Sequence, residues 1–225
     1  MPIAKHNRPP LPEVYRRLYG AWGPQGWWPG RTATEMVVGA VLTQNCAWSN
    51  VEKAISRLKA ARALSLRRLY DASPDELHEW LRPAGYYRVK ARRVRALAAL
   101  VVESYGGRLS LLLREEPERL RAILLGVHGI GPETADSILL YAAGAPYFVV
   151  DAYTRRILTR HGWLREPASY DEVADLFHDA LPRQAPLYNE FHALLVRLGK
   201  DHCRTRPRCE GCPLNSMLPP GGPLG

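Results

Sequence analysis

The chain has 225 residues, of which 46% are hydrophobic and 24% charged, a mixture typical of a folded globular protein and unlike that of a disordered chain. Its 31 Lys and Arg residues outnumber its 22 Asp and Glu residues, so the formal net charge of +9 makes a polyanion a partner to consider. No apolar run has the length of a membrane span, and the polar N-terminus lacks a signal-peptide pattern. We therefore expect no membrane partner and a cytoplasmic location.

Helical periodicity dominates the chain, and the single β-like run, 147–150, is very short. Ser73, Pro74 and Glu76 form a capped helix start, and Gly85 ends that helix. The pattern predicts an all-α protein of about ten helices with essentially no sheet. The other helices are expected at 13–22, 34–44, 50–62, 89–105, 117–125, 132–143, 151–159, 170–181 and 187–198.

A tight turn is expected at 127–131, between two of these helices. Its Gly129 and Gly131 permit positive φ and the close approach of another backbone. The helix that starts at Pro132 directs free N–H groups and the positive end of its dipole out of the turn, which suits a phosphate. A plain helical hairpin is an equal alternative from this segment alone.

Asp151 follows the apolar run 147–150 and opens the next helix. A carboxylate at a helix start is a common N-cap, and for a lone residue that is the simpler interpretation. Its position shortly beyond the glycine turn favours a functional role as well.

Together these segments resemble the endonuclease III superfamily of helix–hairpin–helix DNA glycosylases, and the resemblance covers nearly the whole chain. Four motifs occur in the order of that family. They are Leu42-Thr43-Gln44-Asn45, Gly85 to Ala91, Gly129-Ile130-Gly131 with Thr134-Ala135 and then Val149-Val150-Asp151, and the cysteines Cys203, Cys209 and Cys212.

The resemblance implies a two-lobed fold and base excision repair of duplex DNA that contains damaged bases. One lobe would be a helical barrel at 32–143, and the other would combine 1–31 and 144–225 with the cysteine loop. The damaged base would be flipped into a pocket between the lobes. Asp151 would stabilise the oxocarbenium-like sugar and activate the nucleophile. We expect the protein to act as a monomer.

Bifunctional members of the superfamily carry a lysine in the second helix of the hairpin, and this chain has Glu133 there. Glutamate cannot form a Schiff base with the sugar. The resemblance therefore implies a monofunctional glycosylase, a hydrolase without AP-lyase activity.

A closer resemblance is to the 3-methyladenine glycosylase branch, in the residues Trp27-Trp28-Pro29 and Trp48. An electron-rich aromatic pocket suits a cationic alkylated purine, although tryptophans are also common in cores. Two alternatives stay open: an oxidised-pyrimidine glycosylase of the endonuclease III type, and a damaged-DNA-binding protein with little or no catalysis.

The same motifs predict the contacts with DNA. We expect Gln44 to fill the hole left by the flipped base, and Tyr86 or Tyr87 to wedge into the stack. The remaining contacts are expected from Arg88, Lys90, Gly129, Ile130, Gly131 and Thr134, and from the basic groups Arg92 and Arg93, Arg155 and Arg156, and Arg204, Arg206 and Arg208.

Three of the four cysteines follow the spacing Cys203-x5-Cys209-x2-Cys212, which in a reducing compartment indicates metal ligation. The family motif has a fourth cysteine about six residues later, where 213–218 contains none. We expect a [4Fe–4S] cluster with three cysteine ligands and an unidentified or open fourth position. A Cys3His zinc site and a loop without metal are the alternatives.

Overall fold

The computed structural model describes residues 8–27, 30–165 and 167–225, which form helices and connecting segments and no strand. The prediction of an all-α fold is confirmed. The chain divides into two compact units: unit 1 comprises residues 1–27 and 146–225, and unit 2 comprises residues 28–145. The expected barrel limits, 32–143, lie within unit 2. None of the described helices combines the length and apolarity that crossing a membrane requires.

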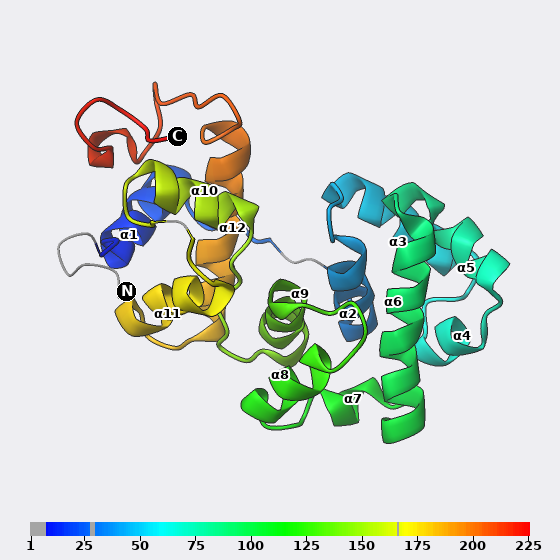
Figure 1. Ribbon diagram of the computed structural model, residues 1–225. Coiled ribbons are helices and arrows are strands. Elements are labelled where there is room, and N and C mark those ends of the chain that lie inside the picture. The colour runs from blue at the N-terminus through cyan, green and yellow to red at the C-terminus, as the bar shows by residue number, and fades with distance from the viewer. Residues whose placement is uncertain (1–7, 28–29, 166) are drawn as a thin grey trace. The chain divides into compact units, whose positions relative to one another are not determined.

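Unit 1 is built around a long C-terminal helix, α12, which contacts α1 and α10 (Figure 1). Its core is aromatic: the ring of Phe148 stacks on that of Phe177 at 3.6 Å, and Phe191 packs edge-on against both. A side chain at Gly199 would overlap the ring of Tyr153, so this glycine lets α10 approach α12 closely. The elements are α1 (Leu11–Trp22), α10 (Ala152–Arg160), α11 (Tyr170–Ala180), α12 (Ala185–Asp201) and the short 3-10 turn η5 (Asn215–Met217).

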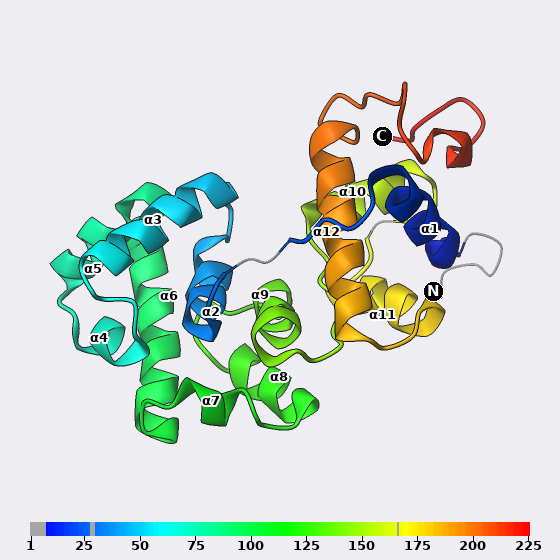
Figure 2. The same ribbon diagram turned by 180° about the vertical axis from the view of Figure 1, so that it is seen from behind.

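Unit 2 is organised by α6, which packs against α2, α4 and α5 (Figure 2). Its Ala91, Val94, Leu97 and Ala98 are buried at helical spacing. The elements are α2 (Ala33–Leu42), α3 (Trp48–Ala60), α4 (Leu66–Asp71), α5 (Pro74–Leu81), η2 (Arg82–Ala84), α6 (Tyr87–Ala99), η3 (Leu100–Ser104), α7 (Leu109–Leu112), α8 (Pro117–Leu125), α9 (Pro132–Ser137) and η4 (Ile138–Ala143).

Local capping explains several helix starts. The side chain of Ser73 accepts the Glu76 N–H and the Glu76 carboxylate accepts the Ser73 N–H, which confirms the expected capping box of α5. Two short helices, α4 and α7, were not expected. The start of α4 carries a recognisable signal, because Ser65 caps it by accepting the Arg68 N–H.

The two helices of the expected hairpin, α8 and α9, are joined by a charged pair. Arg121 Nε donates to Asp136 Oδ1 at 2.7 Å, and the second guanidinium nitrogen lies 3.3 Å from Oδ2. Asp136 is buried, and the two hydrogen bonds from the guanidinium group stabilise its ionised form.

Replacing Arg121 with methionine should therefore destabilise the protein by about 3–5 kcal/mol, because the buried Asp136 carboxylate loses the guanidinium that binds both of its oxygens. Urea unfolding followed by circular dichroism measures the change. Arg119→Met is the matched control: its ion pair with Glu115 is at the surface, with the arginine side chain 71% exposed. That variant should change stability by less than about 0.5 kcal/mol. Equal effects of the two substitutions would contradict a structural role for the Arg121–Asp136 pair.

Candidate functional site

Asp151 is the N-cap residue of α10, as expected. Its Oδ1 accepts the Thr154 N–H at 2.7 Å, and His192 Nε2 on α12 lies 3.6 Å from its Oδ2. Burial alone would raise the pKa of Asp151, but hydrogen bonding and charge from His192, together with the Thr154 hydrogen bonds, hold that pKa below its ordinary value of 3.8. The side chain retains 14% exposure. The result is an ionised, oriented carboxylate at the start of a helix.

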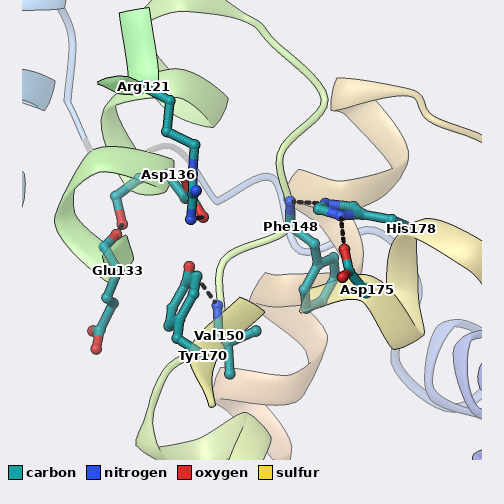
Figure 3. Close-up of polar contacts among 9 residues, drawn as sticks. Arg121, Glu133, Asp136, Phe148, Val150, Tyr170, Asp175 and His178 are labelled. Atoms are coloured by element: carbon teal, nitrogen blue, oxygen red, sulfur yellow. Dashed lines mark hydrogen bonds and ion pairs between the residues drawn. The ribbon is translucent and has the colours of Figure 1, made fainter. Parts of the chain in front are cut away.

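The segment that leads into Asp151 has no regular secondary structure, and side chains of α11 bind its backbone (Figure 3). Phe148 N donates to His178 Nε2 at 3.0 Å, and Val150 N donates to the Tyr170 hydroxyl at 3.2 Å. His178 Nδ1 in turn lies 3.5 Å from Asp175 Oδ1. These contacts replace the strand partner that the segment lacks, and they fix the approach to the carboxylate.

The tryptophans expected to line a base pocket lie in different surroundings. The Trp27 ring is half-buried, with its centroid 5.7 Å from that of His192. The Trp48 ring packs over Gly39, and its Nε1 donates to Glu52 at 3.1 Å. Trp28 and Pro29 lie outside the described residues. Unit 1 therefore brings Trp27, His192 and Asp151 into one chain of contacts.

The turn between α8 and α9 uses its two glycines differently. Gly129 has a φ of 81°, the left-handed conformation that favours glycine, and a Cβ there would lie 2.5 Å from Arg93. Gly131 is the N-cap of α9 with a φ of −97°, and a Cβ would meet nothing within 4 Å. The expectation of a special conformation is thus wrong for Gly131, whose outer face is open.

Two residues expected to contact DNA in this hairpin are engaged internally. Ile130 is buried and its N–H donates to the Val127 carbonyl at 3.0 Å. Thr134 is also buried, and its hydroxyl accepts a hydrogen bond from Gln44 Nε2 at 2.8 Å. Direct phosphate contacts by these two groups do not fit the structure, because packing and hydrogen bonds inside unit 2 already use them.

Gln44 ties the turn after α2 to the hairpin. Its Nε2 donates to the Gly129 carbonyl at 3.0 Å as well as to Thr134, and its Oε1 accepts from Arg93. The neighbouring Asn45 is exposed and has a φ of 51°. In the structure without DNA, the Gln44 amide holds the turn against the hairpin through these hydrogen bonds. Asn45 is the more accessible side chain of the turn.

Lys90 was expected at the DNA surface, and the structure corrects this. The side chain is 1% exposed, and its Nζ donates to the Ala84 carbonyl at 2.6 Å and contacts the Cys46 thiol. Burial lowers the pKa of Lys90, and the Cys46 thiol opposes this effect. The helical spacing placed Lys90 in the apolar stripe of α6, which is why it points inward.

The start of α6 separates the two candidate wedge tyrosines. Tyr86 is 76% exposed, whereas Tyr87 packs edge-on against His78 and beneath the guanidinium groups of Arg82 and Arg88. The geometry therefore favours Tyr86 as the wedge. Arg88 and Arg92 lie on the exposed side of the same helix.

Glu133, in the place of the family lysine, lies exposed in the first turn of α9. An acidic side chain near a helix N-terminus is stabilised by the helix dipole. The structure is therefore consistent with a local structural role for Glu133, and its function stays a prediction.

Several expected DNA-contacting arginines have internal partners. Arg156 Nε donates to the Cys203 carbonyl at 2.7 Å and its Nη2 to that of Gly199 at 3.2 Å, so it braces the cysteine loop. The loop arginines Arg204, Arg206 and Arg208 are exposed and stay candidates for phosphate contacts.

The three clustered cysteines line a single cavity in unit 1. His161, His202 and Leu218 also line it, and Leu218 stands six positions after Cys212, where the family motif has its fourth cysteine. Burial raises the pKa of Cys212, and the neighbouring cysteines Cys209 and Cys203 add to that effect. Among the described residues, no three potential ligands converge on one ion position.

A buried arginine reaches the wall of this cavity. Arg160 is 7% exposed, donates to the carbonyls of Arg204 and Thr205, and lies 3.5 Å from Cys203 Sγ. Within the described part of the chain it forms no ion pair with a carboxylate. A buried guanidinium without a counter-charge is costly, so the cavity suits an anionic group.

His192 and Arg160 were missed by the sequence analysis. Each belongs to a helix whose amphipathic pattern predicts burial, and no short motif marks either residue. Only the packing of α12 on α10 brings His192 to Asp151.

The two hairpin glycines give a matched pair of substitutions. Gly129→Ala should destabilise the protein by at least about 1–2 kcal/mol, because alanine is strained in the left-handed conformation. Gly131→Ala should leave stability within about 0.5 kcal/mol, since its Cβ has open space. If a DNA backbone approaches Gly131, that variant should nevertheless weaken binding to undamaged duplex. Thermal unfolding and fluorescence anisotropy measure the two effects, and unchanged binding by Gly131→Ala would contradict a DNA approach at this turn.

Comparison with known proteins identifies the family. Residues 38–183 match the profile described as "HhH-GPD superfamily base excision DNA repair protein". A Methanocaldococcus jannaschii protein named "Putative DNA repair glycosylase MJ1434" is 43% identical over 206 residues, which cover 91% of this chain and 94% of that protein. Endonuclease III of Thermotoga maritima is 29% identical over 178 residues, with 79% of this chain and 78% of the relative covered.

Among solved structures, the H. pylori 3-methyladenine DNA glycosylase MagIII, bound to 1,N6-ethenoadenine, has a TM-score of 0.75 and 29% identity. The match covers 84% of this chain and 97% of that one. The chain belongs to the HhH-GPD superfamily and is a DNA repair glycosylase of that superfamily.

Proposed function

We propose that the protein is a monofunctional DNA glycosylase that releases alkylated purines from duplex DNA by hydrolysis. The observation that carries the proposal is the Asp151 carboxylate, which Thr154 and His192 approach, together with the Trp27 ring that lies beside the His192 ring. The likeness to a 3-methyladenine glycosylase, at 29% identity, supports the class of base.

The chemistry follows from the charge on Asp151. As the bond between the base and C1′ breaks, its electron pair neutralises the cationic purine, and positive charge develops on the sugar. The anionic carboxylate stabilises that charge. Water then forms the new bond to C1′ and gives up a proton, for which the same carboxylate is the acceptor. The lowered pKa of Asp151 keeps it ionised for both tasks.

The proposed lack of lyase chemistry follows from Glu133. A lysine at this position attacks the sugar in bifunctional relatives, and a carboxylate cannot form the Schiff base. The choice of an alkylated purine follows from Trp27, because an electron-rich ring attracts a cationic base more strongly than a neutral one.

Unit 2 supplies the proposed grip on the duplex. The exposed Tyr86 would wedge into the stack, Gly131 would face a phosphate, and Arg88 would add positive charge. One alternative is that Gln44 releases its hydrogen bonds to the hairpin and fills the space left by the flipped base. The other is that Gln44 keeps those hydrogen bonds and the Asn45 side chain fills that space.

Asp151→Asn tests the catalytic assignment. The variant should lose base release while binding of lesion-containing duplex is retained, because the amide removes the charge and keeps nearly the same size. Release of free base is measured from duplexes with methylated purines, thymine glycol, uracil or a thymine·guanine mismatch, each with and without hot alkali. Turnover by Asp151→Asn equal to the natural chain would contradict the assignment.

The same set of duplex substrates also distinguishes the alternative functions. Release of methylated purine, with strand breaks only after alkali, supports the proposal. Release of thymine glycol would identify an oxidised-pyrimidine glycosylase, and release of uracil or mismatched thymine would show that a cationic base is not required. Spontaneous breaks would show lyase activity. Tight lesion binding without release of any base would identify a damage-binding protein.

We further propose that Cys203, Cys209 and Cys212 hold a [4Fe–4S] cluster. The shared cavity and the buried Arg160 fit an anionic, thiolate-bound group, and a set of three cysteine thiolates suits an iron–sulfur cluster. Leu218 at the fourth position implies a ligand other than cysteine or an open site. The cluster would cross-link the loop that carries Arg204, Arg206 and Arg208.

Cys209→Ser should sharply reduce iron and acid-labile sulfide in protein purified without oxygen, because one of three thiolate ligands is lost. Elemental analysis and protease cleavage within 203–212 measure metal content and loop order. Cys46→Ser is the matched control, since Cys46 belongs to unit 2, and it should leave the metal content unchanged. Zinc in place of iron, or no metal in the natural chain, would contradict the cluster.

A further inference from the structure

We propose that His192 is the positioning residue of the Asp151 carboxylate: its ring directs the Nε2 proton toward Oδ2 and holds the anion in the orientation that excision requires. The inference rests on the proposed glycosylase function and deepens it. It concerns a residue on α12 that belongs to none of the four motifs and lies outside residues 38–183, which match the family profile.

The two carboxylate oxygens are approached from different elements. The Thr154 N–H binds Oδ1 at 2.7 Å from within α10, and His192 Nε2 lies 3.6 Å from Oδ2 across the contact with α12. The terminal torsion of an aspartate is broad, so one hydrogen bond leaves the second oxygen free to turn. His192 Nε2, which at 3.6 Å lies just beyond hydrogen-bond length, is the group on another helix that is placed to fix the plane of the carboxylate.

The His192 ring is itself held in place. It is 5% exposed, its centroid lies 5.7 Å from that of Trp27, and the Phe148 ring meets it edge-on at 6.5 Å. Oδ2 of an ionised carboxylate can only accept a hydrogen bond, so the facing Nε2 must carry a proton for the contact to be favourable. A proton on Nε2 is therefore what the position of the carboxylate requires.

The same ring connects the carboxylate with the aromatic side chain proposed to meet the base. A shift of His192 would move the Asp151 carboxylate, and misplacement by about 1 Å can slow a reaction about 100-fold. Such a loss belongs to the chemical step, because neither His192 nor Asp151 is needed for the grip of unit 2 on the duplex.

The test compares His192→Leu, which removes the donor, with His192→Gln, which restores an amide N–H at similar reach. Single-turnover excision of methylated purine should fall about 100-fold in His192→Leu, with the Kd for lesion duplex unchanged, and His192→Gln should recover most of that rate. Tyr188→Phe is the control for disturbing buried α12, since the Tyr188 hydroxyl is buried without a hydrogen-bond partner in the described structure, and it should keep the full rate.

A second readout does not depend on activity. In ¹⁵N-histidine NMR spectra, assigned by the signal that His192→Gln lacks, His192 should carry its proton on Nε2, and Asp151→Asn should shift that nitrogen. An Nε2 that carries no proton, or an unchanged rate in a folded His192→Leu, would overturn the proposal. If the natural chain releases no base while the Nε2 signal responds to Asp151→Asn, the glycosylase function fails and the positioning contact stands.

Discussion

Both units depend on one constraint: backbone N–H and C=O groups outside regular helices must still form hydrogen bonds. The described structure has no strands, yet the functional segments are irregular, so their N–H and C=O groups need side-chain partners. Side chains of α11 bind the N–H groups before Asp151, Lys90 binds the Ala84 carbonyl, and Gln44 binds that of Gly129. Each turn that carries a candidate function is thus fixed by a side chain from another element.

This constraint limits how much of the net positive charge is available at the surface. The net charge of +9 suggests a surface adapted to a polyanion, but several of the cations counted in it point inward. Lys90, Arg93, Arg156 and Arg160 bind carbonyls, an amide or a thiol inside their own units. The charge proposed to face DNA therefore rests on fewer groups, chiefly Arg88, Arg92 and the exposed arginines of the cysteine loop.

The parts that sequence predicts well are those set by local chemistry. The capping box at Ser73, the cap at Asp151 and the positive φ of Gly129 each follow from neighbours within a few residues. The inward direction of Lys90 was missed because a charged residue in a basic run looks exposed until the apolar stripe of α6 is placed against its neighbours. His192 was missed because its partner depends on the packing of distant helices.

The turn before α6 shows how one residue of the candidate DNA interface lowers the stability of the free protein. Tyr86 has a φ of 44° and is 76% exposed, so a bulky side chain occupies the left-handed region without burying its ring. That conformation costs a side-chain-bearing residue about 1–2 kcal/mol relative to an ordinary backbone angle. Glycine at this position would relieve the strain and would also remove the wedge. If Tyr86 is the proposed wedge, the turn is a stability–activity trade-off confined to one residue: the free protein is less stable there, and the exposed ring would gain its contacts within a base stack.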